Sequence, residues 1–294
     1  MKGFFKGTAT AMITPFNKDG VNFAAFGKMI EYQIANGTDA LVILGTTGEP
    51  STMTEEEKIA VMKFSVEKIG GRAKVIFGSG SNNTAQAIEA SKRAEALGAD
   101  GLLCVTPYYN KCTQKGIVAY YTAICSAVKI PVIAYNVPPR TGVNILPATA
   151  EEIAKIPNLA GIKEACGNME QICETMRRVR PYCDVYSGDD NLNLPILAIG
   201  GAGLISVASN IAPKQVKEVY TLMSERDLDG ANALQDKLLP LIDACFTEVN
   251  PIPVKAGCDM LGLDAGVPRA PLTELEDVHK DIMRGCIERL GLKL

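Results

Sequence analysis

Eight short apolar runs recur along the chain about 30 residues apart, and they constrain its fold more than any other feature. The runs lie at 8–16, 40–45, 74–80, 101–107, 131–138, 159–165, 184–190 and 203–209. Amphipathic helical patterns separate them, and one of these begins with a capping box formed by Thr54 and Glu57. Apolar strands that alternate with helices indicate a parallel sheet covered on both faces. Eight such units predict an α/β protein with a (β/α)8 TIM barrel.

An open doubly wound sheet is the alternative architecture for this pattern. Its dinucleotide-binding form requires a glycine-rich turn directly after a strand. Gly78 and Gly80 follow the third run without a third glycine, and the GGAG sequence at 200–203 precedes its strand. The sequence therefore does not support dinucleotide binding.

The pattern changes after the eighth unit. Residues 1–224 contain all eight runs and are predicted to form the barrel, whereas 225–294 are predicted to form a C-terminal helical segment packed on it. In that segment a helix begins near Asp227, and a proline-rich NPIPVK sequence at 250–255 indicates a turn. A last helix is predicted from the spacing of Val278, Ile282 and Leu290.

The charge balance and hydropathy of the chain limit the kinds of molecule that it is expected to bind. The chain has 30 Lys and Arg against 33 Asp and Glu, with a net charge of -3, so neither nucleic acid nor a membrane surface is expected to bind. Lys6 and Pro15 interrupt the N-terminal apolar stretch, which does not resemble a secretory signal, and a cytoplasmic location is predicted. The uncharged stretch at 191–213 indicates a buried helix followed by a strand.

Cysteine and histidine usage excludes several chemistries. The nine cysteines are odd in number and contain no CxxC pair, which argues against a disulfide framework or a zinc knuckle. His279 is the only histidine, so a serine or cysteine nucleophile has no plausible histidine base, and a metal site with several histidine ligands, as in zinc aldolases, cannot be assembled. The remaining catalytic candidates are Lys, Tyr, Thr and carboxylates.

Lys163 is the only lysine at the carboxyl end of an apolar run, where barrel enzymes carry their catalytic groups. Desolvation there lowers the pKa of an amine and makes it a nucleophile, which predicts a Schiff base with a ketone. The alternative is a structural lysine paired with Glu164 or another carboxylate.

Three further segments at the ends of other apolar runs contain candidate catalytic or binding residues. Tyr135 could shuttle protons, or it could be a packed aromatic residue. Arg140, in a loop with two prolines, suits a substrate carboxylate, but a surface arginine is the alternative. The GTTGE sequence at 45–49 is either an oxyanion or carboxylate cradle or a plain turn. Asp189 and Asp190 make a phosphate site after the seventh run less favourable.

Four motifs together resemble those of the pyruvate-dependent class I aldolases. They are GTTGE at 45–49, TPYYN at 106–110, YNVP at 135–138 with Arg140, and GIKE at 161–164. The resemblance covers essentially the whole chain. It implies a lyase that needs no metal or organic cofactor, in which Lys163 forms an imine with pyruvate and Tyr135 relays protons. Thr47 would link Tyr135 to Tyr109 of the partner subunit, so a tight homodimer would be required, and a tetramer is the usual assembly.

The resemblance also implies how the substrates are held. Thr46 and Thr47 would hold the pyruvate carboxylate, and backbone groups of Gly188 and Ile205 would line the site. The pyruvate enamine would attack aspartate semialdehyde, whose carboxylate Arg140 would bind, in an early step of lysine and diaminopimelate biosynthesis. N-acetylneuraminate lyase and the 2-keto-3-deoxy sugar acid aldolases are the enzyme alternatives, although the lyase lacks an arginine of this kind. A silent metabolite-binding barrel is the third alternative.

Some members of this family are inhibited by lysine at a pocket between subunits. The corresponding positions here are Pro50, Ser51, Glu55, Lys58, Asn82, Gln86 and Tyr108. Lys58 would repel the ammonium of a bound lysine, and neutral Gln86 replaces a carboxylate. Weak or absent lysine inhibition is therefore predicted.

Overall fold

The computed structural model describes residues 2–294. Its eight parallel strands are β1 (Gly7–Ala11), β4 (Ala40–Ile43), β5 (Lys74–Gly78), β6 (Gly101–Val105), β7 (Val132–Asn136), β8 (Leu159–Glu164), β9 (Asp184–Ser187) and β10 (Gly203–Ser206). They form a closed barrel in the order β1-β10-β9-β8-β7-β6-β5-β4. The predicted TIM barrel is thereby confirmed, and each strand lies within or overlaps a predicted run. A two-stranded hairpin, β2 (Phe16–Asn17) with β3 (Gly20–Val21), was not predicted.

Helices follow the strands, as the alternating pattern predicts. They are α1 (Phe23–Ala35), α2 (Glu55–Ile69), α3 (Thr84–Ala96), α4 (Gln114–Ala127), α5 (Pro138–Thr141), α6 (Pro147–Ala154), α7 (Met169–Val179), α8 (Asn193–Ala198), α9 (Pro213–Ser224), α10 (Leu228–Ala244), α11 (Ile252–Met260) and α12 (Asp277–Arg289). The chain divides into two compact units, one of residues up to Lys6 with 74–205 and one of 7–73 with 206–294.

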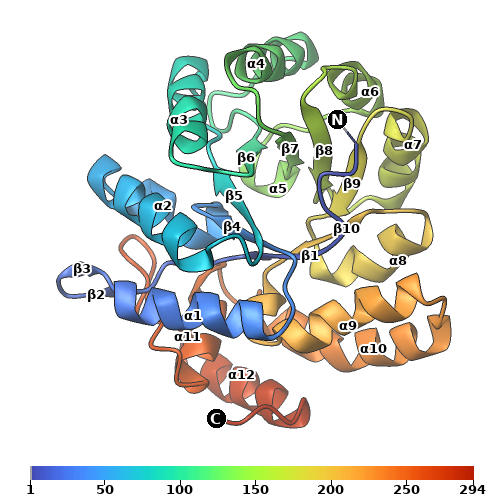
Figure 1. Ribbon diagram of the computed structural model, residues 1–294. Coiled ribbons are helices and arrows are strands. Elements are labelled where there is room, and N and C mark those ends of the chain that lie inside the picture. The colour runs from blue at the N-terminus through green and yellow to red at the C-terminus, as the bar shows by residue number, and fades with distance from the viewer. Residues whose placement is uncertain (1) are drawn as a thin grey trace. The chain divides into compact units, whose positions relative to one another are not determined.

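The first unit contains strands β5 to β9, which pair in parallel with their sequence neighbours. Helices α3, α4, α6 and α7 lie along the outside of these strands (Figure 1). The register places Tyr135 of β7 directly beside Lys163 of β8, and both residues lie near the carboxyl ends of their strands. The alignment of parallel strands therefore brings two residues 28 positions apart in the sequence together.

The second unit contains β1 and β4, which pair in parallel, with helices α1, α2 and α9 to α12. Helix α2 begins with the predicted capping box, in which Thr54 accepts from the Glu57 N–H and Glu57 accepts from the Thr54 N–H. Helix α10 begins directly after Asp227, also as predicted. Helices α9 and α10 lie side by side in Figure 1.

The structure corrects one prediction for the C-terminal segment and adds detail to another. The NPIPVK sequence is not only a turn, because helix α11 begins inside it at Ile252; proline fits the first turn of a helix, where the N–H has no intrahelical acceptor. The predicted last helix is α12, but Val278 and Ile282 do not form its buried face, since they are 60% and 44% exposed. The helix instead buries Met283, Cys286 and Ile287, which follow the i, i+3, i+4 spacing of one helical face.

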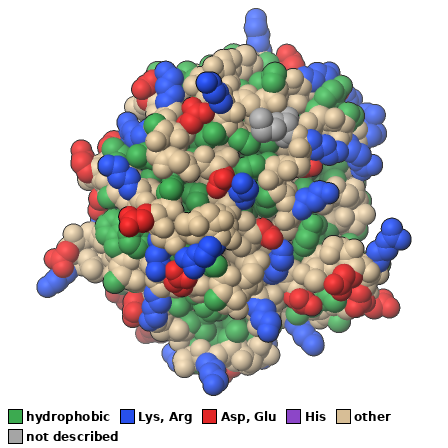
Figure 2. Space-filling view, viewed as in Figure 1, with side chains coloured by type: hydrophobic (Ala, Val, Ile, Leu, Met, Phe, Trp, Pro, Cys, Tyr) green, Lys and Arg blue, Asp and Glu red, His purple; other side chains and the backbone are tan. Residues whose placement is uncertain are grey.

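The uncharged stretch contains helix α8 and strand β10, in the predicted order, and every residue of β10 is buried. Over residues 2–294, none of the helices has both the length and the apolar character needed to cross a membrane. On the face drawn in Figure 2, Lys and Arg side chains are interspersed with Asp and Glu. That face carries no broad area of one charge.

Candidate active site

Lys163 and Tyr135 form the centre of the site in the first unit. The Lys163 side chain is 4% exposed, and its Nζ lies 4.3 Å from the centroid of the Tyr135 ring. The tyrosine is itself buried. An ammonium over an aromatic face is attracted by the ring quadrupole, so this contact orients the amine toward its neighbour.

Burial makes Lys163 a stronger nucleophile. Desolvation lowers the pKa of its amine to about 8, with a smaller contribution from the positive charge of Arg140, while Asp190 opposes the shift. At neutral pH about a tenth of such an amine is unprotonated, several hundredfold more than for an unperturbed lysine. A fraction of the Lys163 amine is therefore neutral, the form that can attack a carbonyl carbon.

Tyr135 remains a neutral phenol over the working pH range. Burial raises its pKa to about 12, and the negative charges of Asp189 and Glu164 add to the shift, while Arg140 opposes it. A neutral phenol both donates and accepts a hydrogen bond. It can therefore give a proton to a leaving hydroxyl and recover one from another donor.

Gly188 has no side chain, and the Lys163 side chain passes through the space that a side chain there would fill. A Cβ atom at position 188 would lie 2.9 Å from Lys163 Cε, too close for any larger residue without displacing the lysine. The Gly188 N–H donates to the carbonyl of Glu164, which holds the loop after β9 against the end of β8. Ile205, the other predicted backbone residue, is fully buried in β10.

The Glu164 carboxylate does not form the structural pair considered for Lys163. Successive residues of a strand face opposite sides, and Glu164 accepts hydrogen bonds from Asn136 Nδ2 and the Cys166 N–H. Asn136 Nδ2 also donates to Asn144 Oδ1, and the Ile145 N–H donates to Asn136 Oδ1. This buried network fixes the ends of β7 and β8 and the loop that carries Arg140.

Arg140 and Tyr109 are presented to solvent. Arg140 lies in the short helix α5 directly after β7, where its exposed guanidinium acts electrostatically on both Tyr135 and Lys163. Tyr109 has a positive φ of 68° and is 89% exposed. The sequence suggested Arg140 for a substrate carboxylate, and the exposure of its guanidinium leaves that role a prediction.

The GTTGE sequence of the second unit is more ordered than a plain turn. Thr46–Gly48 form a 3-10 helix, and Glu49 follows in the left-handed conformation with a φ of 55°. Thr46 is exposed, whereas Thr47 is buried and its Oγ1 accepts a 2.9 Å hydrogen bond from Asn250 Nδ2. Thr14 Oγ1 donates to the Gly48 carbonyl.

Sequence reasoning missed the residues that hold this loop. Lys255 is completely buried, and its ammonium donates to Glu49 Oε1 at 2.8 Å and to the carbonyls of Thr14 and Val267. The Arg269 N–H donates to Glu49 Oε2. A lysine inside an apolar helical stretch is the signal that could have pointed to such a buried ion pair.

The positions predicted for a lysine pocket each have local contacts of their own. Lys58 and Glu55 form an ion pair of 2.8 Å at the start of helix α2. Gln86 is exposed in the first turn of α3 and accepts from Ser81 Oγ, while the Asn82 carbonyl accepts from Asn110. Pro50 and Ser51 begin a short 3-10 helix, and Tyr108 is partly exposed.

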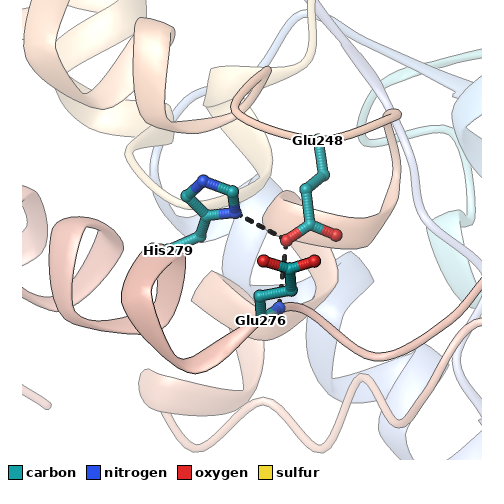
Figure 3. Close-up of side chains that lie close together, drawn as sticks. All are labelled: Glu248, Glu276 and His279. Atoms are coloured by element: carbon teal, nitrogen blue, oxygen red, sulfur yellow. Dashed lines mark hydrogen bonds and ion pairs between the residues drawn. The ribbon is translucent and has the colours of Figure 1, made fainter.

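His279 lies in a small cluster with Glu248 and Glu276, the only group in residues 2–294 with metal-ligand spacing (Figure 3). Glu248 Oε1 lies 2.7 Å from His279 Nδ1 and accepts from the Glu276 N–H. Glu276 is the residue before helix α12, so Glu248 satisfies a backbone donor at the start of that helix. The cluster ties the segment before Asn250 to α12.

A buried amine of lowered pKa beside a buried phenol, at the carboxyl ends of two barrel strands, defines a Schiff-base-forming TIM-barrel lyase. The chain belongs to the dihydrodipicolinate synthetase family, whose model matches residues 4–290.

Curated relatives agree with this family over nearly the full length. The chain is 46% identical over 291 residues to a 4-hydroxy-tetrahydrodipicolinate synthase of Caldicellulosiruptor bescii, with 99% of this chain and 98% of the relative covered. It is 49% identical over 276 residues to a protein of the same name from Alkaliphilus oremlandii, with 94% and 95% covered.

Solved structures give the same result. The dihydrodipicolinate synthase of Aquifex aeolicus superposes with a TM-score of 0.96 at 41% identity, covering 99% of each chain. That of Thermotoga maritima superposes with a TM-score of 0.97 at 39% identity, covering 98% of this chain and 99% of the other.

Proposed function

We propose that this chain condenses pyruvate with L-aspartate 4-semialdehyde to give 4-hydroxy-tetrahydrodipicolinate, an early step of lysine and diaminopimelate biosynthesis in the cytoplasm. The observation that carries the proposal is the buried Lys163 amine beside the Tyr135 phenol. The names of the relatives support the choice of substrates.

The first half of the reaction forms an imine. The neutral Lys163 amine attacks the ketone carbon of pyruvate, and the resulting carbinolamine loses its hydroxyl as water. Tyr135, a neutral phenol because burial raises its pKa to about 12, supplies the proton that this hydroxyl needs to leave. Loss of a methyl proton then converts the imine into the nucleophilic enamine.

The phenol that has given a proton must be reprotonated. We propose that Thr47 passes protons between Tyr135 and Tyr109 of the partner subunit, and that Thr46 and Thr47 hold the pyruvate carboxylate together with backbone groups of Gly188 and Ile205. The proposal is supported by the 89% exposure of Tyr109 in the single chain. A tyrosine presented in this way can serve a neighbouring subunit.

The second half joins the two substrates. The enamine carbon attacks the aldehyde carbon of the semialdehyde, whose carboxylate Arg140 binds through its planar guanidinium. The semialdehyde amine then attacks the imine carbon, which closes the ring and releases the Lys163 amine. Without a bound carboxylate, the second substrate would lose its orientation but the imine would still form.

A substrate comparison tests this assignment. Purified protein is given pyruvate with either aspartate semialdehyde or N-acetylmannosamine, and consumption of pyruvate is followed. We expect turnover with the semialdehyde only, and Arg140→Ala to raise the KM for the semialdehyde at least tenfold while leaving imine formation intact. Arg177→Ala, which removes an exposed arginine paired with Glu174, is the matched control. Turnover with the sugar instead would contradict the proposal.

Subunit mixing tests the shared site. Lys163→Ala and Tyr109→Phe are each expected to abolish or greatly reduce turnover. A dimer that contains one subunit of each kind regains one complete site, so random reassociation should restore about a quarter of wild-type activity. No recovery, with mixed dimers demonstrated by native mass spectrometry, would refute a tyrosine supplied by the partner.

A further inference from the structure

The proline-rich segment at 250–255 holds the loop at 45–49 at two points, Thr47 and Glu49. At its start, Asn250 Nδ2 donates to Thr47 Oγ1 at 2.9 Å. At its end, Lys255 Nζ donates to Glu49 Oε1 at 2.8 Å. The beginning of helix α11 lies between these two contacts, so a single rigid turn of the chain sets the position of the threonine.

The ion pair at Glu49 makes the loop backbone rigid. Both of its partners are buried, and the three hydrogen bonds of the Lys255 ammonium go to Glu49 and to the carbonyls of Thr14 and Val267. The second oxygen of Glu49 accepts from the Arg269 N–H. A buried pair with its donors and acceptors satisfied holds one geometry, because any displacement would leave a buried charge uncompensated.

The hydrogen bond from Asn250 determines which way the Thr47 hydroxyl points. A hydroxyl has one hydrogen and two acceptor lone pairs, and its hydrogen rotates to suit its neighbours. Since the amide N–H of Asn250 occupies one lone pair, the Thr47 hydrogen must point away from Asn250 toward another acceptor. Both side chains are buried, so bulk water does not compete for this arrangement.

We infer that Asn250 is a positioning residue that keeps the Thr47 hydroxyl hydrogen available for the proton relay. This inference rests on the proposed function, in which Thr47 passes protons between two tyrosines. With an amide donor on one side, the Thr47 hydroxyl keeps its hydrogen for donation in the proposed relay, and its remaining lone pair can accept the next proton. Asn250 itself neither touches a reacting atom nor changes its protonation.

Asn250→Asp tests the direction of this hydrogen bond with little change in shape. Ionised aspartate can only accept, so it draws the Thr47 hydrogen toward itself, leaves no hydrogen for either tyrosine and interrupts the relay. We expect kcat at pH 8 to fall about 10- to 100-fold, up to the lower end of the contribution usual for acid–base groups, with the KM for pyruvate changed less than threefold. Asn250→Ala removes the donor without adding an acceptor and should lose less.

The pH profile separates orientation from a merely structural role. When the new carboxyl group is protonated it can donate to Thr47 as the amide does, so the ratio of Asn250→Asp to wild-type kcat should rise as pH falls from 8 to 5.5. The same ratio for Asn250→Ala should stay flat. Asn158→Asp is the matched control, because its amide donates to three carbonyls at the opposite end of β8 and has no place in the relay.

A double-mutant cycle keeps the test valid if the aspartate variant is less stable. If Asn250 acts through Thr47, Asn250→Asp should have no further effect on kcat in a Thr47→Val background. A wild-type kcat in both Asn250 variants, a pH-independent ratio for Asn250→Asp, or full additivity with Thr47→Val would each overturn the inference. Absence of any pyruvate adduct on the wild-type protein would instead refute the proposed function itself.

Discussion

Replacing Lys163 by methionine should stabilise the protein at neutral pH, although it removes the proposed nucleophile. The structure buries this ammonium, and the fall of its pKa from 10.5 to about 8 corresponds to about 3 kcal/mol of unfavourable desolvation in the folded state. Loss of the contact with the Tyr135 ring offsets about 1–2 kcal/mol of the gain. The expected net increase in the free energy of unfolding is about 1–2 kcal/mol at pH 7.

The pH dependence of this difference has a definite sign. Below pH 8 the amine is protonated in both the folded and the unfolded state, so the wild type bears the full cost of burial. Between pH 8 and 10.5 the unfolded chain holds a proton that the folded chain has lost, and wild-type stability rises relative to the variant. The advantage of Lys163→Met should therefore shrink as pH rises through this window.

Denaturant unfolding at fixed protein concentration, followed by circular dichroism at pH 7 and pH 10, measures the difference. Lys255→Met is the comparison, because it leaves the buried Glu49 carboxylate without its partner and should cost about 3–5 kcal/mol. A Lys163→Met protein that is less stable than wild type at pH 7, or whose advantage does not change at pH 10, would refute the account of Lys163.

Three further predictions concern the site and its regulation. Tyr135→Phe should lower kcat about 100-fold, with a small effect on the KM for pyruvate in steady-state assays, because it removes the proton donor but keeps the ring; an unchanged kcat would contradict the relay. Gly188→Ala should slow borohydride trapping of pyruvate more than tenfold, since the added Cβ would lie 2.9 Å from Lys163 Cε, and an unchanged trapping rate would show that the space is not needed. Added lysine should inhibit weakly or not at all, because Lys58 and Gln86 disfavour a bound ammonium; strong inhibition at low millimolar concentration or below would overturn this.

Much of the fold could be predicted because buried parallel strands carry a local signal. Each strand of the barrel is a short apolar run, and the capping box at Thr54 and Glu57 marks the start of α2 without reference to the rest of the chain. Which face of α12 is buried could not be predicted from such a local signal. Val278 and Ile282 fit a helical period as well as Met283 does, and only packing decides which residues are buried.

Only some residues of the site could be predicted from the sequence, for the same reason. Lys163 and Tyr135 could be proposed because the carboxyl end of a barrel strand is a position that the sequence reveals. Asn250 and Lys255 could not, since their partners Thr47 and Glu49 lie about 200 residues earlier and no local pattern links them. A proline-rich segment predicts a turn, but it does not predict what that turn holds.

Covalent trapping tests the central claim, imine formation at Lys163, most directly. The protein is incubated with pyruvate and borohydride, with and without aspartate semialdehyde, and the adduct is located by peptide mass mapping. We predict one adduct on the peptide that contains Lys163, diminished by the semialdehyde because the second substrate consumes the enamine. An adduct on another lysine, or none at all, would contradict the account.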